Sequence, residues 1–181
     1  MTSRKSQGTA IKRVRTPTRR KLETRETGFE HFEVRAAVKV NGYKVTRQVP
    51  PSVIVKTIRT GVSAYFIRQM AGDMAVPQES IYETLGLARA TLARKAKEGK
   101  RMSPNETERA LGLARLIGQV EEMVTRSGTA KGFDAARWTA EWLQQPNPSL
   151  DGKRPAEWMD PAVGRELVSE TLARIESGVY A

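Results

Sequence analysis

The chain has no cysteine and only one histidine among its 181 residues. Disulfide bonds, thiolate metal sites and cysteine nucleophiles are therefore excluded. His31 stands alone in a strand-like stretch between glutamates, where an imidazole is far more often a surface residue than a general base or a metal ligand. No pair of carboxylates comes with a glycine-rich or metal-binding pattern. The sequence thus predicts a protein that is not an enzyme, with no catalytic residue, no metal site and no cofactor.

Long apolar runs are also missing. No stretch approaches the about 20 apolar residues that a membrane-spanning helix needs. The basic amino terminus lacks the apolar segment of a secretory signal. We therefore expect a cytoplasmic protein that does not enter a membrane. Its apolar content of 39% is high enough to form a buried core, in one ordinary domain or two small ones.

The positive charges are concentrated at the amino terminus. The net charge of the chain is +11, and most of it comes from residues 1–28, where only Glu23 and Glu26 are acidic. Because this segment has almost no apolar residues, it cannot bury enough surface to offset the entropy of ordering. We predict that residues 1–28 are a disordered basic tail that binds polyanions through counterion release. A leader that only keeps the protein soluble is the alternative.

Residues 29–51 predict a β-hairpin. The stretch FEVRAAVKVNGYKVTRQV alternates apolar and polar residues on either side of Asn41-Gly42. This dipeptide accepts positive φ at both central positions of a tight turn. Pro50-Pro51 would end the second strand. Since an isolated hairpin is only marginally stable, we expect it to dock on the helices or on a second copy of the chain.

The apolar spacing becomes helical from residue 52, and residues 52–128 predict a helical domain. Within it, PQESIYETLGLARATLARKAKEG contains a short helix with Ile81 and Leu85 facing inward, a break at Gly86, and a second helix with Leu92 facing inward. This spacing is typical of a helix-turn-helix, in which the second helix reaches base edges and phosphates in the major groove.

Cationic side chains dominate the outward face of the second helix, which favours DNA contact. An ordinary pair of packed helices is the alternative, and Tyr82 stands where many helix-turn-helix units have a small residue. The predicted DNA-binding residues are Arg89, Thr91, Arg94, Lys95, Lys97, Lys100 and Arg101.

A long helix follows. Ser103, Pro104 and Glu106 form the pattern of a capping box, and the helix is expected to end at Arg126, before Ser127-Gly128. One apolar stripe runs along it, which indicates core or a dimer seam rather than chemistry. The stripe consists of Ala110, Leu111, Ala114, Ile117, Val120 and Val124.

The carboxy-terminal segment, residues 133–181, is shorter than the about 70 residues below which a single core rarely suffices. It must therefore pack on something else. We predict a helix capped by Asp134 that carries Trp138 and Trp142, and a last helix that begins after Asp160-Pro161. That last helix has apolar residues facing one way: Val163, Leu167, Val168, Leu172 and Ile175, with Thr171 among them.

The stretch NPSLDGKRPAEW, residues 147–158, joins these two helices. A nucleotide-binding loop needs two spaced glycines, then Lys and Ser or Thr, between a strand and a helix. Here there is one glycine, Gly152, the loop follows a helix, and Pro155 lacks the amide that a phosphate would use. The dipeptides Asn147-Pro148 and Asp151-Gly152 instead predict a turn.

The whole stretch WTAEWLQQPNPSLDGKRPAEWMDPAVGRELVSETLARIESGVYA strongly resembles the toxin-binding domain of the Xre/MbcA/ParS antitoxin family. The shared features are a Trp-Leu segment, an Asn-Pro-x-Leu-x-Gly-x-x-Pro turn, a Gly-Arg-x-x-Val helix and a Gly-Val-Tyr-Ala ending. The match covers residues 133–181. Residues 52–126 are similar, less tightly, to the Xre-type helix-turn-helix half of the same family. The tail and the predicted hairpin match nothing in the family.

The resemblance implies a mainly α-helical antitoxin of a type II toxin–antitoxin system, with a helix-turn-helix domain followed by a small helical toxin-binding domain. Such an antitoxin blocks the active-site entrance of a RES-domain toxin, an NAD-consuming or ADP-ribosylating enzyme, and as a homodimer binds operator DNA and represses its own promoter. The implied toxin-binding residues are Arg165, Arg174, Ile175, Gly178, Val179, Tyr180 and Ala181.

One alternative function remains. The chain could be a DNA-binding transcriptional regulator without a toxin partner, in which the carboxy-terminal domain senses or oligomerises.

The role of Tyr180 also has an alternative. Tyrosine is a favoured interface anchor, but Tyr180 could instead pack back on Trp158 or Trp142 of its own domain.

Overall fold

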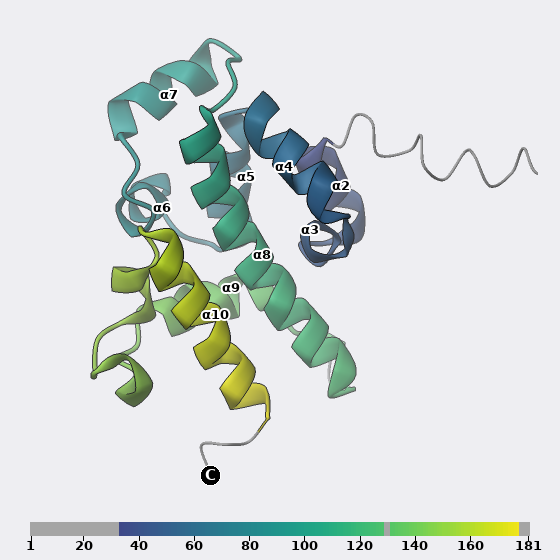
Figure 1. Ribbon diagram of the computed structural model, residues 1–181, viewed down its shortest axis with the longest axis vertical. Helices are drawn as coiled ribbons and strands as arrows, with labels where there is room; N and C mark the ends of the chain where they lie inside the picture. The colour runs from purple at the N-terminus through teal and green to yellow at the C-terminus, as the bar shows by residue number, and fades with distance from the viewer. Residues whose placement is uncertain (1–32, 129–130, 178–181) are drawn as a thin grey trace, which may run out of the picture. The chain divides into compact units, whose positions relative to one another are not determined.

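The computed structural model describes residues 33–128 and 131–177 (Figure 1). The chain divides into two units, residues 1–31 and 32–181, and every described element lies in the second. The described part is mainly helical and contains no strand, only an isolated bridge between Ser63 and Arg101. Its helices are α2 (Val34–Asn41), α3 (Val45–Gln48), α4 (Pro51–Thr60), α5 (Tyr65–Asp73), α6 (Gln78–Thr84), α7 (Arg89–Lys97), α8 (Pro104–Arg126), α9 (Ala135–Leu143), the 3-10 turns η2 (Pro148–Leu150) and η3 (Pro155–Trp158), and α10 (Ala162–Glu176). The mainly α-helical fold class is therefore confirmed.

The prediction of a hairpin over 29–51 is wrong wherever the structure describes that segment, because α2 and α3 occupy it. Residues 29–32 and the predicted tail, 1–28, lie outside the described residues. Val34 and Val38 fit a helical turn as well as a strand, and both are buried. Val40, which strand alternation would place beside them, is 80% exposed.

The conformation of Gly42 explains why Asn41-Gly42 wrongly predicted a hairpin turn. Gly42 has a φ of 74°, as a hairpin turn would need, but it uses this conformation to end α2. Its amide donates a hydrogen bond to the carbonyl of Val38 at 2.9 Å. Tyr43 is then buried, and its hydroxyl donates to Asp73 of α5 at 2.7 Å. The Asn-Gly pair therefore works as a helix cap here, a position that also favours positive φ.

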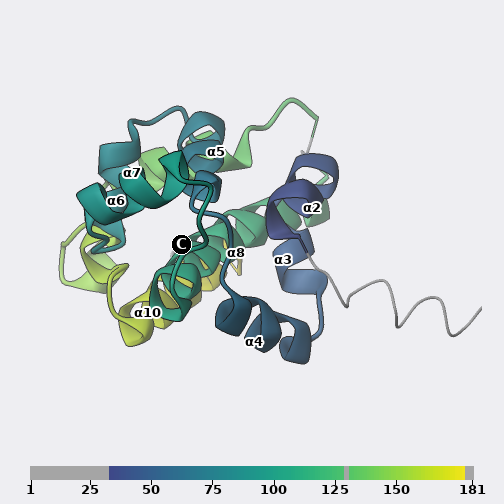
Figure 2. The ribbon, with the colours of Figure 1, turned by 90° about the horizontal axis from the view of Figure 1, so that it is seen from above.

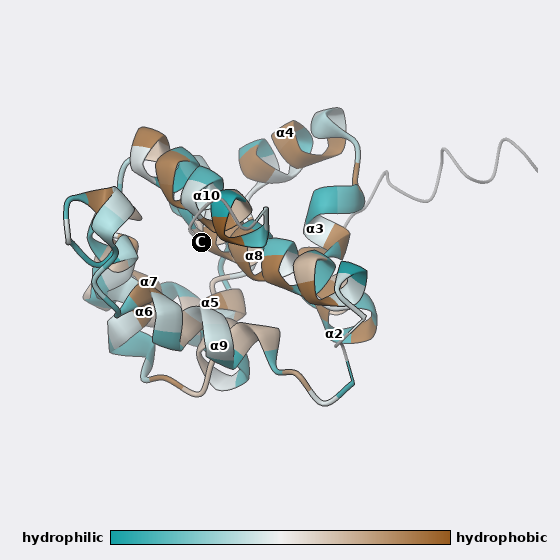
Figure 3. Ribbon diagram, turned by 90° about the horizontal axis from the view of Figure 1, so that it is seen from below, coloured by the Kyte–Doolittle hydropathy of each residue, from teal (hydrophilic) through white to brown (hydrophobic). Residues whose placement is uncertain are grey.

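α8 is the central helix of the fold. It packs against α3 and α4 on one side and against α9 and α10 on another (Figure 1; Figure 2). The predicted capping box is confirmed: the Ser103 hydroxyl accepts from the Glu106 amide at 3.3 Å, and the Glu106 carboxylate accepts from the Ser103 amide at 2.6 Å. The predicted apolar stripe of α8 is buried core except for Val124, which is partly buried, and apolar residues recur along this helix in Figure 3.

The carboxy-terminal helices complete a core that is continuous with that of α5 to α8. Asp134 caps α9, on which the rings of Trp138 and Trp142 stack with centroids 6.0 Å apart. The turn predicted for 147–158 is confirmed, with Asp151 in the left-handed conformation between η2 and η3. Two details of α10 were wrong: Val163 is 78% exposed and Ile175 is 37% exposed rather than inward, because the buried face runs from Gly164 to Leu172.

Candidate functional site

α6 and α7 are joined as two short helices around a glycine turn. Gly86 has a φ of 57°, and the amide of Leu87 donates to the carbonyl of Tyr82 at 2.8 Å. Leu85 and Leu92 are buried and hold the two helices together. Tyr82 is accommodated in this packing, where burial and the nearby Glu79 carboxylate raise its pKa.

Two cations on the exposed face of α7 take no part in the contacts that hold the fold. Arg94 and Lys97 are exposed, and neither side chain forms a hydrogen bond or ion pair with another described residue. Thr91 is half-buried on the same helix. Among the predicted DNA-binding residues, Arg94 and Lys97 are thus the most available to an external partner.

Two more of these cations form exposed ion pairs. Arg89 contacts Glu79 of α6 at 2.8 Å, and Lys100 contacts Glu98 at 2.7 Å. Ion pairs this exposed contribute about 1 kcal/mol or less to the stability of the fold. Both cations therefore can exchange their carboxylate for a phosphate at little cost.

The remaining two cations help to hold the fold. Lys95 donates to Glu106 at 2.6 Å, linking α7 to α8. Burial raises the pKa of Glu106, but hydrogen bonds from Lys95 and from the N-cap residue outweigh burial and lower it. Arg101 donates to the carbonyl of Gly61 at 2.7 Å and to Glu33 at 2.9 Å. Lys95 and Arg101 are therefore already engaged inside the chain.

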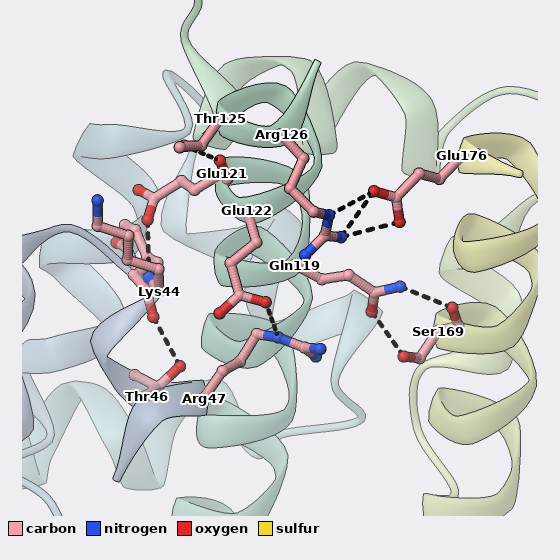
Figure 4. Close-up of polar contacts among 11 residues, drawn as sticks. Lys44, Thr46, Arg47, Gln119, Glu121, Glu122, Thr125, Arg126, Ser169 and Glu176 are labelled. Carbon is pink, nitrogen blue, oxygen red and sulfur yellow. Dashed lines mark hydrogen bonds and ion pairs between the residues drawn. The ribbon is translucent and has the colours of Figure 1, made fainter. Parts of the chain in front are cut away.

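α10 is fixed along α8 by paired polar contacts (Figure 4). Gln119 donates to the carbonyl of Ser169 at 2.9 Å and accepts from the hydroxyl of Ser169 at 2.6 Å. Further along, Arg126 donates to both carboxylate oxygens of Glu176, at 2.8 and 2.9 Å. These contacts hold α10 alongside α8 from its middle to its last turn.

Arg165, predicted to face a toxin, has only 10% of its side chain exposed. It donates to the carbonyls of Met159 and Asp160, at 3.1 and 2.5 Å, and to Glu108 of α8 at 2.5 Å. It lies against Gly112, where a β-carbon would come within 2.7 Å of the arginine stem. Arg165 thus holds the start of α10 on α8.

The other toxin-facing candidates lie at the far end of α10. Arg174 is exposed and 3.9 Å from Glu170, and Ile175 is 37% exposed. Gly178, Val179, Tyr180 and Ala181 lie outside the described residues. The structure therefore separates the early Arg165 from Arg174 and Ile175 at the end of the helix.

The sequence did not predict the contacts of Arg109, which join α8 to the turn before α7 and to the start of α10. Arg109 donates to the carbonyls of Leu85 and Gly86, each at 2.9 Å, and forms an ion pair with Asp160 just before α10. We call these contacts of Arg109 the junction. The other contact of Arg109 is Asn105, one turn earlier, at 3.1 Å. No local spacing could signal this junction, because the partners are far apart in sequence and come together only when the core forms.

Neither a membrane helix nor a metal cluster is present in the described part of the chain. No helix among residues 33–128 and 131–177 is long and apolar enough to cross a bilayer. The same residues contain no group of three or more acidic, histidine or cysteine side chains placed to hold a metal ion.

Comparison with known proteins identifies both halves. Residues 53–115 match the model of the antitoxin Xre-like helix-turn-helix domain. Residues 132–178 match the model of the antitoxin Xre/MbcA/ParS C-terminal toxin-binding domain.

Two relatives align over most of their length. A protein of Sphingobium sp. (strain YBL2), named Prs ADP-ribosylating antitoxin, is 38% identical over 139 residues, which cover 77% of this chain and 87% of that protein. A protein named Antitoxin Xre, from Yersinia enterocolitica serotype O:8 / biotype 1B (strain NCTC 13174 / 8081), is 25% identical over 130 residues, 72% of this chain and 82% of that protein.

Proposed function

Since the chain belongs to the Xre/MbcA/ParS antitoxin family and is a non-enzymatic antitoxin of a toxin–antitoxin system, we propose that its partner is a RES-domain toxin, which it inhibits by steric block. We further propose that it acts in the cytoplasm as a homodimer that binds operator DNA and represses its own promoter. The Sphingobium relative is named for ADP-ribosylation, which favours an ADP-ribosylating partner over one that degrades NAD.

The observation that carries the toxin-blocking proposal is the fixed end of α10. The two hydrogen bonds between Arg126 and Glu176 hold the last turn of this helix on α8. Arg174 and Ile175 are exposed on that turn. An apolar residue exposed beside a cation suits a partner cleft, because its burial there removes apolar surface from water. Gly178 to Ala181 follow directly, and we propose that they enter the active-site cleft.

The DNA-binding proposal is supported by α7. The exposed side chains of Arg94 and Lys97 have no partner within the described part of the chain, so binding a phosphate or a base edge breaks no contact of the fold. α7 lies near the amino-terminal end of α8, whereas Glu176 is bound at the carboxy-terminal end of α8 (Figure 1). The two proposed interfaces are therefore at opposite ends of this helix, and one chain can bind both partners.

Removal of residues 178–181 tests the toxin-blocking proposal and leaves the Arg126–Glu176 pair intact. The full chain and the truncated chain are each expressed with a RES-domain toxin, and cell growth and co-purification are measured. We expect the truncation to abolish protection while binding to the promoter DNA stays unchanged. Removal of residues 2–5 is the matched control and should leave protection intact.

The rival function, a transcriptional regulator without a toxin partner, gives the opposite result. In that case the truncation makes no difference to cell growth in the presence of the toxin, and no toxin co-purifies with the full-length protein. That outcome would reject the toxin-blocking proposal and retain the DNA-binding one.

A further inference from the structure

The turn that precedes α7 is held by residues from outside the helix-turn-helix pair. One guanidinium nitrogen of Arg109, Nη1, donates hydrogen bonds to the carbonyls of both Leu85 and Gly86, at 2.9 Å each. These carbonyls close α6 and open the turn into α7, so their position sets where α7 begins. The Arg109 side chain is only 22% exposed, and a charged donor shielded in this way makes stronger hydrogen bonds than a neutral one.

Asp160 completes this junction from the carboxy-terminal half of the chain. Its carboxylate pairs with Arg109, and it also lies directly against Gly86. A β-carbon at Gly86 would come within 2.6 Å of the Asp160 carboxyl carbon. Asp160 therefore both orients the guanidinium and covers the turn.

The position of Asp160 is fixed in turn by α10. The backbone carbonyl of Asp160 accepts a hydrogen bond from Arg165 at 2.5 Å, and Arg165 also pairs with Glu108, the neighbour of Arg109 on α8. Two ion pairs, Arg109 with Asp160 and Glu108 with Arg165, therefore start from adjacent residues of α8. The start of α10 and the turn before α7 are thus anchored to the same place on α8.

We propose that Asp160 and Arg109 are positioning residues for α7, so that the module matching the toxin-binding family model also sets the sequence discrimination of the DNA-binding helix. This inference rests on the proposed DNA-binding function. Neither residue needs to touch DNA. A recognition helix discriminates only when its side chains meet base edges in register, whereas phosphate contacts tolerate small shifts. Loss of the junction should therefore lower the preference for the promoter sequence over other sequences more than it lowers the affinity for DNA of any sequence.

The test measures binding of the full chain to a duplex from its own promoter and to a scrambled duplex of the same composition. We expect Arg109→Ala and Asp160→Asn each to lower the ratio of the two affinities roughly tenfold, about the effect of removing one base-reading side chain. Since the partners act as a pair, the double variant should lose no more than Arg109→Ala alone. Arg115→Ala is the matched control, because Arg115 is exposed on the same helix and has no partner among the described residues.

A purely structural role predicts a different result. A variant that is only less stable loses affinity for both duplexes in proportion to its unfolded fraction, which thermal unfolding measures separately. Asp160 is 54% exposed, so Asp160→Asn should fold even if Arg109→Ala does not. If the wild type discriminates and both folded variants keep its ratio within about twofold, the inference is wrong and the DNA-binding proposal stands. If the wild type itself does not discriminate, the DNA-binding proposal fails and the inference fails with it.

Discussion

Gly164 of α10 lies directly against the backbone of Trp158 in η3. A β-carbon at this position would overlap the carbonyl oxygen of Trp158 and lie 2.9 Å from its carbonyl carbon. The 3-10 turn can therefore fold back onto the first turn of α10 only because residue 164 has no side chain. This contact gives the Gly-Arg-x-x-Val motif a structural reason for its glycine.

Gly164→Ala should destabilise the protein by about 1 to 3 kcal/mol, because the methyl group forces backbone apart in a packed site. Urea unfolding at neutral pH measures the change. Gly72→Ala is the control: Gly72 is also helical, but no atom lies within 4 Å of a β-carbon built there. Its replacement should stabilise the protein by about 0.5 to 1 kcal/mol through helix propensity. Equal effects of the two substitutions would contradict the steric explanation.

Arg94→Ala should weaken binding to the promoter duplex by about 1 to 3 kcal/mol and relax sequence discrimination, if Arg94 reads a base. The fold should be unaffected, because Arg94 is exposed and has no partner within the described residues. Fluorescence anisotropy with promoter and scrambled duplexes measures both effects. Lys56→Ala on the exposed face of α4 serves as the control for loss of one positive charge. An equal loss on both duplexes would assign Arg94 to phosphate contact instead.

Removal of residues 1–28 should act differently from Arg94→Ala. These residues carry most of the net charge of +11, and charge–phosphate contacts are blind to sequence. We expect affinity for both duplexes to fall by the same factor, and the dependence of log K on log salt to become less steep by about 0.9 for each phosphate that the tail neutralises. A titration over a range of salt concentrations measures the slope. A change in the ratio of the two affinities, with an unchanged slope, would count against the polyanion-binding tail.

The structural features that the sequence predicted correctly are local. The capping box of Ser103 and Glu106 involves residues three apart, so the pattern itself contains both partners. The turn at Asn147 is equally local, since its side chain accepts from the amide of Ser149, two residues on. The burial of Leu111 and Ile117 followed from helical spacing alone. A short window of sequence contains both partners of such an interaction, so the pattern can be recognised without the fold.

The features that the sequence did not predict depend on tertiary packing. Asn41-Gly42 indicates positive φ, which a hairpin turn and a helix end both use. Only the burial of Tyr43 decides between them, with its hydroxyl on Asp73 of α5 and its backbone against Gly118 of α8. The family resemblance implied that Arg165 faces a toxin, and nothing near it in the sequence indicated that Glu108 meets it across 57 positions. The ion pair of Arg109 with Asp160 has no local signal for the same reason. Ion pairs between segments distant in sequence must be read from the structure.

The carboxylate of Glu106 should give the protein an acid-sensitive stability. It accepts hydrogen bonds from Lys95 and from the amide of Ser103, both at 2.6 Å, and these lower its pKa below the ordinary value of 4.5 despite burial. A carboxyl group whose pKa is lower in the folded state stabilises the fold above its unfolded pKa, and this contribution is lost as pH falls through the folded pKa. Glu106→Gln keeps an acceptor for the Ser103 amide but removes the charge.

At pH 7 we expect Glu106→Gln to lower the free energy of unfolding by about 1.5 to 3 kcal/mol, the range for hydrogen bonds to a charged group. The difference from wild type should begin to shrink as pH falls below 4.5 and continue to shrink as the wild-type carboxylate is protonated. Urea unfolding at pH 7, 5, 4 and 3 measures it. Glu166→Gln is the control, since Glu166 is exposed and has no partner in the described part of the chain. A difference that stays constant down to pH 3 would mean that the charge of Glu106 does not contribute to the cap.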